Sequence, residues 1–141
     1  MEFNPDKVSK ITFEIFSAIE RLEDLKKLPE KDFIADQHKI GSAKYNLIVA
    51  VEGAIDLCNH IIAKNSFKTP EDYADTFRVM AEKGAFDAEF AKVLIQMARF
   101  RNRLVHIYWD IDNLEIYKII QLHLGDVREF LKRFGVFISG K

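Results

Sequence analysis

Apolar residues recur at intervals of three and four positions along most of the chain, which is the spacing of one helix face. The first such stripe predicts a helix from about residue 5 to residue 28, with Asn4 as its N-cap. A second and broader stripe predicts a long, deeply buried helix from about residue 31 to residue 65, in which Gly41 is a candidate break.

Two shorter helices are expected next. The segment "TPED" at residues 69–72 supplies an N-cap, a first-turn proline and an acidic third position, so a helix is predicted over about 70–83. Gly84 ends it. The apolar stripe that starts near Asp87 predicts a fourth helix that runs through Val105.

A last helix follows an interruption at "YWDIDN", residues 108–113. Asp112 is its expected cap, because Glu115 lies three residues further on, and the helix is expected to end near Gly135. Short connections between successive helices favour antiparallel neighbours. The chain is therefore predicted to be an all-α, antiparallel bundle of about five helices.

The composition of the chain agrees with a helical bundle and also indicates a cellular compartment. The chain has 141 residues with only 3 prolines and 6 glycines, so a single helical domain over residues 1–141 is expected. The single cysteine, Cys58, excludes an intramolecular disulfide and fits a reducing compartment. The N-terminus is polar, and the apolar stretches are interrupted by charge before they reach a membrane-spanning length, so we expect a cytoplasmic protein with no membrane partner.

Charge is distributed unevenly along the chain although the net charge is only -1. Residues 90–109 contain no acidic residue but include Lys92, Arg99, Arg101 and Arg103. This segment is either a solvated basic helix face or, in a symmetric dimer, half of a positive cleft. The apolar surface of the second and fourth helices is likewise either a hint of self-association or simply core.

Several kinds of site are excluded by what the sequence lacks. It has no Glu-x-x-His pair, no His-Glu-x-x-His motif and no glycine-rich phosphate loop. Cys58 lies in an apolar stretch, which favours a buried and inert thiol. No metal and no cofactor are therefore expected.

The segment around His106 contains groups that suit RNA cleavage without a metal. A histidine exchanges protons near neutral pH, nearby arginines favour its neutral form, and an arginine holds two phosphate oxygens at once. On an ideal helix, however, Arg101 and His106 diverge by roughly 140°, whereas Asn102 and His106 share a face. A wide cleft, a distortion of the helix before Tyr108, or pieces supplied by two subunits would be needed. The alternative is a helix-end histidine bonded to a backbone carbonyl.

These residues resemble a known family. The run from Arg101 to Tyr108 reads Arg-x4-His-x-Tyr, which is similar to the signature of HepT-type toxins in the HEPN superfamily. The segment Tyr45–Ala63, with acidic residues and a histidine spaced by four, resembles the long second helix of that family. The resemblance extends over roughly residues 8–134.

The resemblance implies a HEPN-like homodimer that acts as a metal-independent ribonuclease toxin, with further assembly left open. Carried over to this chain, Arg101 would bind the phosphate and His106 would act as general base or acid. Asn102 would orient His106 or the phosphate. The motif histidines and arginines of two protomers would line one cleft, where the RNA substrate would bind.

The resemblance also implies a partner and a regulatory modification. In this family a minimal nucleotidyltransferase antitoxin of the MntA type transfers AMP to the motif tyrosine, which is Tyr108 here. Added phosphates would block the site with charge and bulk. Glu52, Asp56, His60 and Arg103 would contact substrate or form a polar network.

A second function from a different class stays open at this point. The near-neutral charge also fits a non-catalytic helical subunit that binds a nucleotide or holds a nucleotidyltransferase on its substrate. Growth arrest on expression without a partner would separate the two.

Overall fold

The computed structural model describes residues 1–140, and Lys141 of the domain expected over 1–141 lies outside them. Within the described residues the chain forms six α-helices, one 3₁₀-helix and no strand. In chain order these are α1 (Pro5–Lys26), α2 (Glu30–Ile34), α3 (Gln37–Lys64), α4 (Tyr73–Glu82), α5 (Ala88–His106), η1 (Tyr108–Asp110) and α6 (Asn113–Ser139). The all-α prediction is confirmed.

Most helices begin at a side chain that accepts hydrogen bonds from the first free backbone N–H groups. Asn4 caps α1 and Asp112 caps α6 through the N–H of Glu115, both as the sequence predicts. The cap of α4 is Asp72 and not Thr69, so this helix starts three residues later than expected. Gly84 follows α4 with a φ of +94°, a conformation that a glycine adopts without strain.

Two further helix boundaries differ from the prediction. The long helix expected from residue 31 is divided into α2 and α3 before Gln37, where Asp36 has extended backbone angles and caps α3, whereas Gly41 lies within the helix. The last helix runs past Gly135 to Ser139. It ends there because Gly140 takes the left-handed conformation.

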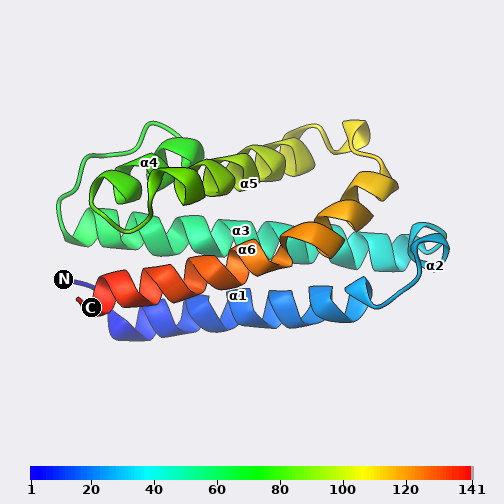
Figure 1. Ribbon diagram of the computed structural model, residues 1–141, viewed down its shortest axis with the longest axis horizontal. Helices are drawn as coiled ribbons and strands as arrows, with labels where there is room; N and C mark the ends of the chain where they lie inside the picture. Colours follow the sequence, from blue (N-terminus) through cyan, green and yellow to red (C-terminus); the bar gives the residue numbers. More distant parts are fainter. Residues whose placement is uncertain (141) are drawn as a thin grey trace.

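Helix α3 is the central element of the bundle (Figure 1). It packs against α1, α4, α5 and α6, and α1 and α6 pack against each other. The chain termini lie together at one end, whereas α2 and η1 lie at the opposite end. The C-terminal end of α5, where the Arg-x4-His-x-Tyr run begins, therefore points toward that second end.

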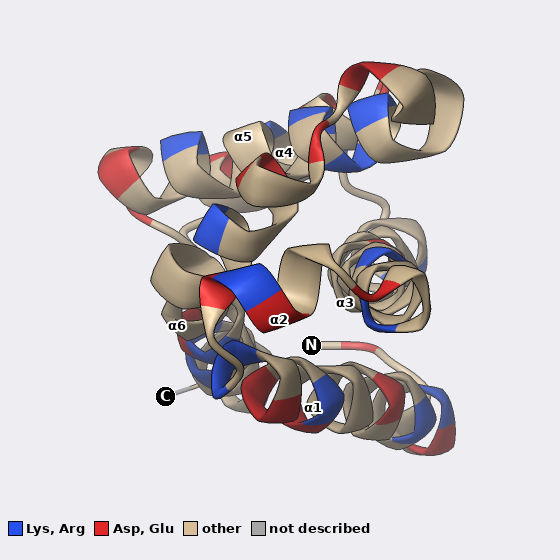
Figure 2. Ribbon diagram, turned by 90° about the vertical axis from the view of Figure 1, so that its right-hand side faces the viewer, with Lys and Arg blue, Asp and Glu red and all other residues tan. Residues whose placement is uncertain are grey.

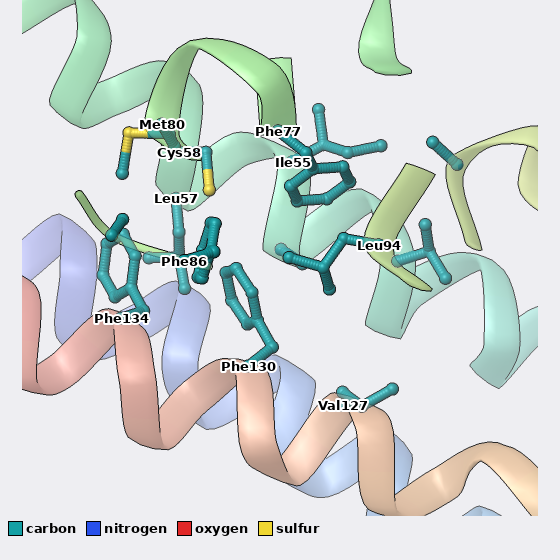
Figure 3. Close-up of a cluster of buried hydrophobic side chains, with 14 of the residues drawn as sticks. Ile55, Leu57, Cys58, Phe77, Met80, Phe86, Leu94, Val127, Phe130 and Phe134 are labelled. Carbon is teal, nitrogen blue, oxygen red and sulfur yellow. The ribbon is translucent and has the colours of Figure 1, made fainter. Parts of the chain in front are cut away.

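The core has two parts along the length of α3. Around the C-terminal half of α3, phenylalanines of three segments meet (Figure 3), and the Phe130 ring contacts those of Phe77, Phe86 and Phe134 at centroid distances of 6.2, 5.7 and 5.7 Å. Nearer the η1 end, a second cluster includes Phe33, Leu104, Ile111, Ile116 and Ile120. This second cluster anchors the segment that follows His106 through the buried Ile111.

Glu52 and Asp56 interrupt the apolar stretch of α3 with charge, as expected from the sequence for the chain in general. By length and composition α3 could cross a membrane, with a mean hydropathy of 1.4 over its best 18 residues. In the structure 67% of that window is buried inside the bundle. Its apolar composition is accounted for by its place at the centre of the core.

Helices α1 and α3 approach each other closely at Gly53. A Cβ at this position would lie 2.5 Å from Cγ1 and 2.9 Å from Cδ1 of the fully buried Ile15. We expect Gly53→Ala to lower the free energy of unfolding by about 1 to 2 kcal/mol, because overpacking outweighs the gain in helix propensity. Urea unfolding measures this.

Gly125→Ala is the matched control for Gly53→Ala, because a Cβ at Gly125 in α6 meets nothing within 4 Å. There the gain in helix propensity acts alone, and stability should rise by about 0.5 to 1 kcal/mol. An equal gain in both variants would contradict the close packing of α1 on α3.

Candidate functional site

Arg101 is held by side chains from two helices. Its Nε and Nη2 groups both donate to Oε1 of Glu52 on α3, with an Nε to Oε1 distance of 3.0 Å. Its Nη1 group donates to Oδ1 of the neighbouring Asn102 at 3.0 Å. Because three of its five N–H donors are used, the guanidinium is fixed in one orientation, and one N–H on each terminal nitrogen is left over.

The face of the guanidinium is covered as well. The ring of Tyr73, the first residue of α4, lies with its centroid 4.9 Å from Cζ of Arg101. The Arg101 side chain is only 11% exposed as a result of these contacts. Sequence reasoning missed Tyr73, since it precedes Arg101 by 28 residues and carries no motif.

Glu52 and Asp56 bring negative charge to the same place. They lie one turn apart on α3, as their spacing predicts. Burial, and then the neighbouring Glu52 carboxylate, raise the pKa of Asp56, while Lys7 and Arg101 act in the opposite direction. Arg101 therefore lies in an acidic surrounding on its α3 side.

Asn102 has a different partner from the one that helix geometry suggested. It shares a face of α5 with His106, but its Oδ1 accepts from Arg101. Within residues 1–140, Asn102 thus contacts the guanidinium and makes no hydrogen bond to the imidazole of His106.

Arg103 links α5 to α6. Its two terminal nitrogens donate to the two oxygens of Glu115 at 2.8 and 3.1 Å. This hydrogen bonding raises the pKa of Arg103 further above its usual value. This bidentate ion pair joins the two helices that flank the turn from Ile107 to Asp112. Arg103 therefore belongs to a polar network that positions this turn.

His106 and Tyr108 lie on either side of the end of α5. His106 is the last residue of α5, and its side chain is exposed and makes no hydrogen bond within residues 1–140. The alternative of a histidine bonded to a backbone carbonyl therefore does not describe this conformation. Tyr108 opens η1, is 60% exposed, and meets the exposed Trp109 edge to face at 5.4 Å.

The positive charge of residues 90–109 is largely offset in the folded chain. Arg101 and Arg103 are each paired with a carboxylate of another helix, whereas Arg99 is exposed and has no ion pair among the described residues. The end view in Figure 2 shows acidic and basic residues interleaved along α1, with both signs present around the molecule. Of the two alternatives for this segment, the solvated basic helix face is not what the single chain presents, because Arg101 and Arg103 are paired.

His60 is part of the N-terminal packing and lies apart from Arg101's contacts. It is 7% exposed, and its Nε2 accepts from the backbone N–H of Asn4 at 2.9 Å. Asn65 binds the same segment through the backbone N–H and carbonyl of Glu2. The polar network expected for His60 is thus a link between the start of the chain and the end of α3.

Burial, followed by the nearby Lys7 and Lys64 charges, lowers the pKa of His60 from 6.5. Below pH 6.5 the unfolded chain takes up this proton before the folded chain does, so we expect stability to fall as the pH drops from 6.5 toward the lowered folded value. His60→Gln keeps an acceptor without titrating, and should flatten that part of the stability profile. Urea unfolding between pH 5 and 8 measures both; equal slopes would contradict the role of His60.

Among residues 1–140, no group of three or more His, Cys, Asp or Glu side chains is arranged to hold a metal ion. Cys58 is fully buried, and burial raises the pKa of its thiol well above the usual value. The chemistry-bearing side chains of the α5 end are thus Arg101, His106 and Tyr108.

Two curated nucleases are similar in sequence to this chain. The chain is 28% identical over 86 residues to the mRNA nuclease HepT of Shewanella oneidensis, a match that spans 61% of this chain and 65% of that protein. It is 28% identical over 95 residues to the tRNA nuclease HepT of Aphanizomenon flos-aquae, spanning 65% and 63% of the two chains. The chain thus matches slightly less than two thirds of the length of these two relatives.

Solved structures share the fold. A tri-AMPylated HEPN toxin of Shewanella oneidensis, solved with its MNT antitoxin, superposes with a TM-score of 0.85 at 24% identity, covering 93% of this chain and 98% of that one. YutE of Bacillus subtilis, a cytosolic protein of unknown function, has a TM-score of 0.78 at 18% identity, covering 94% and 90%. The family model "Ribonuclease HepT-like" matches residues 15–134. The chain therefore belongs to the ribonuclease HepT-like family.

Proposed function

We propose that this protein is the ribonuclease toxin of a toxin–antitoxin pair, and that it cleaves RNA without a metal through Arg101 and His106. The observation that carries the proposal is the fixed Arg101 guanidinium, which retains one unused N–H on each terminal nitrogen. Two parallel N–H groups match two oxygens of one phosphate. Glu52, Asn102 and Tyr73 fix the side chain, and we assign the two remaining N–H groups to the substrate phosphate.

His106 supplies the proton transfer. In the proposed reaction its imidazole takes the proton from a ribose 2′-hydroxyl, whose oxygen then attacks the adjacent phosphorus. The bond from phosphorus to the 5′-oxygen breaks, and that oxygen takes a proton from the imidazolium of His106 of the second protomer in a homodimer. The products are a 2′,3′-cyclic phosphate and a 5′-hydroxyl end. Arg101 stabilises the charge that accumulates on the phosphate oxygens during attack.

A homodimer resolves the separation of Arg101 and His106. On an ideal helix, five residues separate them by about 140° and about 7.5 Å along the axis, so the two side chains leave α5 on different faces, and we assign the second group of the site to another copy of the chain. Glu52 and Asp56 also offset the charge of Arg101, which favours extra positive charge from a second copy. An apolar groove of about 290 Å³ between α3, α5 and α6, lined in part by Met97 and Phe100, supports self-association.

Tyr108 is the proposed site of control by a nucleotidyltransferase antitoxin. The exposed phenol oxygen would attack the α-phosphate of ATP, forming a bond to AMP and releasing pyrophosphate. Each AMP adds a phosphodiester charge two residues from His106. A negative group there repels the RNA backbone and occupies its space.

Expression without a partner tests the toxin. The unmodified protein should arrest growth and degrade cellular RNA, and Arg101→Ala and His106→Ala should abolish both effects. Arg99→Ala is the matched control, because Arg99 is an exposed arginine of the same helix without an ion pair in the described chain. Growth arrest by the His106→Ala variant would overturn the proposal.

A non-catalytic subunit is the second candidate, favoured by the burial of Arg101. An arginine that is 11% exposed and paired with Glu52 also suits a purely structural role. In that case the protein would bind a nucleotide or hold a nucleotidyltransferase on its substrate. Expression alone would then leave growth and RNA unchanged.

A further inference from the structure

A second cavity shares one residue, Tyr73, with the surroundings of Arg101. It has a volume of about 460 Å³ and lies between the end of α3 and the start of α4. Figure 1 shows the connecting segment leaving α3 and returning to α4 there. Its lining includes Asn59, Ala63, Phe67, Glu71 and Tyr73.

Tyr73 joins the cavity to the proposed phosphate site. The ring that stacks on the Arg101 guanidinium also lines the cavity. A nucleotide whose phosphate binds the free edge of Arg101 therefore has this cavity as a neighbour. Glu52 and Asn102, the other two contacts of Arg101, do not line this cavity.

The lining suits a neutral ring and not a phosphate. Glu71 and Asp72 contribute carboxylates, which repel an anion. Tyr73 and Phe67 offer aromatic surface, on which a nucleobase of any kind can stack. The volume is ample for one base.

One polar side chain in the cavity contacts a buried hydroxyl. Thr76, which is 1% exposed, shares its one hydroxyl proton between Oδ1 of Asn59 at 3.0 Å and the backbone carbonyl of Asp72 at 3.3 Å. This leaves the Asn59 amide nitrogen as a donor, with no hydrogen-bond partner among residues 1–140. The Glu71 carboxylate, an acceptor, is exposed and has no ion pair in that range.

We propose that this cavity is a base-binding subsite, which takes a nucleobase of the RNA strand held at Arg101 and favours bases with an exocyclic amino group. The proposal rests on the function proposed above. The Asn59 amide nitrogen donates to a ring acceptor, and Glu71 accepts from the amino group. Uracil lacks that amino group, so it is disfavoured at this position.

The test is a substitution that fills the cavity and leaves the hydrogen bonds of Asn59 and Arg101 in place. Ala63→Phe places a ring in it from an exposed position of α3, and Lys64→Phe adds the same ring to the adjacent residue, which does not line the cavity. Glu71→Gln removes only the carboxylate charge. The substrate is a random-sequence RNA pool whose cut ends are sequenced, and kcat/KM is measured on one substrate selected from it.

We expect wild type to cut with uracil depleted at one fixed position beside the cut. Ala63→Phe should lower kcat/KM by about tenfold and weaken that depletion, Glu71→Gln should weaken the depletion, and Lys64→Phe should resemble wild type. If wild type cuts and Ala63→Phe matches Lys64→Phe in rate and sequence preference, the subsite is refuted while the ribonuclease stands.

A wild type that cuts no RNA would refute the proposed function, and the subsite is then judged by binding alone. The probes are 2′-O-methyl oligonucleotides of cytosine and of uracil, which cannot be cleaved. Weaker binding of the cytosine probe to Ala63→Phe than to Lys64→Phe would support the subsite. Equal binding would overturn it.

Discussion

Replacing Arg101 with lysine is expected to lower kcat/KM for RNA cleavage by about a hundredfold or more, although the positive charge is kept. Lysine has no planar fork, so it cannot contact Glu52, Asn102 and two phosphate oxygens at once. Only a role that depends on charge alone would tolerate the change. Initial rates of cleavage of a fluorescent RNA, with wild type measured in parallel, give the ratio.

Two controls separate this loss from unfolding. Arg99→Lys changes an exposed arginine of α5 and should leave the rate within about twofold of wild type, as surface changes usually do. Thermal unfolding of the Arg101→Lys variant shows whether the bundle persists. A folded Arg101→Lys protein with wild-type activity would refute bidentate phosphate binding by this side chain.

Replacing Tyr108 with phenylalanine is expected to make the toxin insensitive to its nucleotidyltransferase. The ring that contacts Trp109 is kept, while the oxygen that accepts AMP is removed. RNA cleavage should therefore continue. Coexpression with the nucleotidyltransferase should no longer rescue growth. Mass spectrometry of the coexpressed protein should show AMP on wild type and none on the variant.

Tyr45→Phe is the matched control for Tyr108→Phe. Tyr45 is equally exposed, at 64%, but lies on α3 and outside the Arg-x4-His-x-Tyr run. Its loss should leave both AMP transfer and rescue intact. Full rescue of Tyr108→Phe by an active partner would show that control acts through binding and not through this oxygen.

The helical fold was predictable because its signals are local. Asn4 and Asp112 cap helices through side-chain contacts two or three residues away, and such contacts follow from short sequence spacing. The candidate break was expected at Gly41, whereas the helix begins anew after Asp36. Gly41 stays helical because a glycine is tolerated inside a helix. Sequence spacing does not reveal which of two breakers tertiary packing selects.

The candidate site was predictable only in part, because its contacts are long-range. The sequence indicated Arg101, His106 and Glu52 as candidates, but not that Glu52 binds Arg101 across 49 positions. It suggested His106 as the partner of Asn102 from helix geometry, whereas Asn102 binds its neighbour Arg101. Tyr73 had no local signal, since its role arises from the way α4 lies beside α5.

The charge of the segment shows the same limit. A stretch of twenty residues without an acid suggested a basic surface, yet acids from α3 and α6 pair with its arginines once the chain folds. Net positive charge for RNA must then come from Arg99, from other exposed cations or from a second copy of the chain. This makes RNA affinity sensitive to salt and to protein concentration.

Cleavage of RNA in the presence of EDTA tests the central claim most directly. Purified wild type should cut RNA at the same rate with and without the chelator, leaving 2′,3′-cyclic phosphate ends, and His106→Ala should lower that rate by about a hundredfold or more. Cleavage that stops on chelation, or that survives undiminished in a folded His106→Ala protein, would contradict the account.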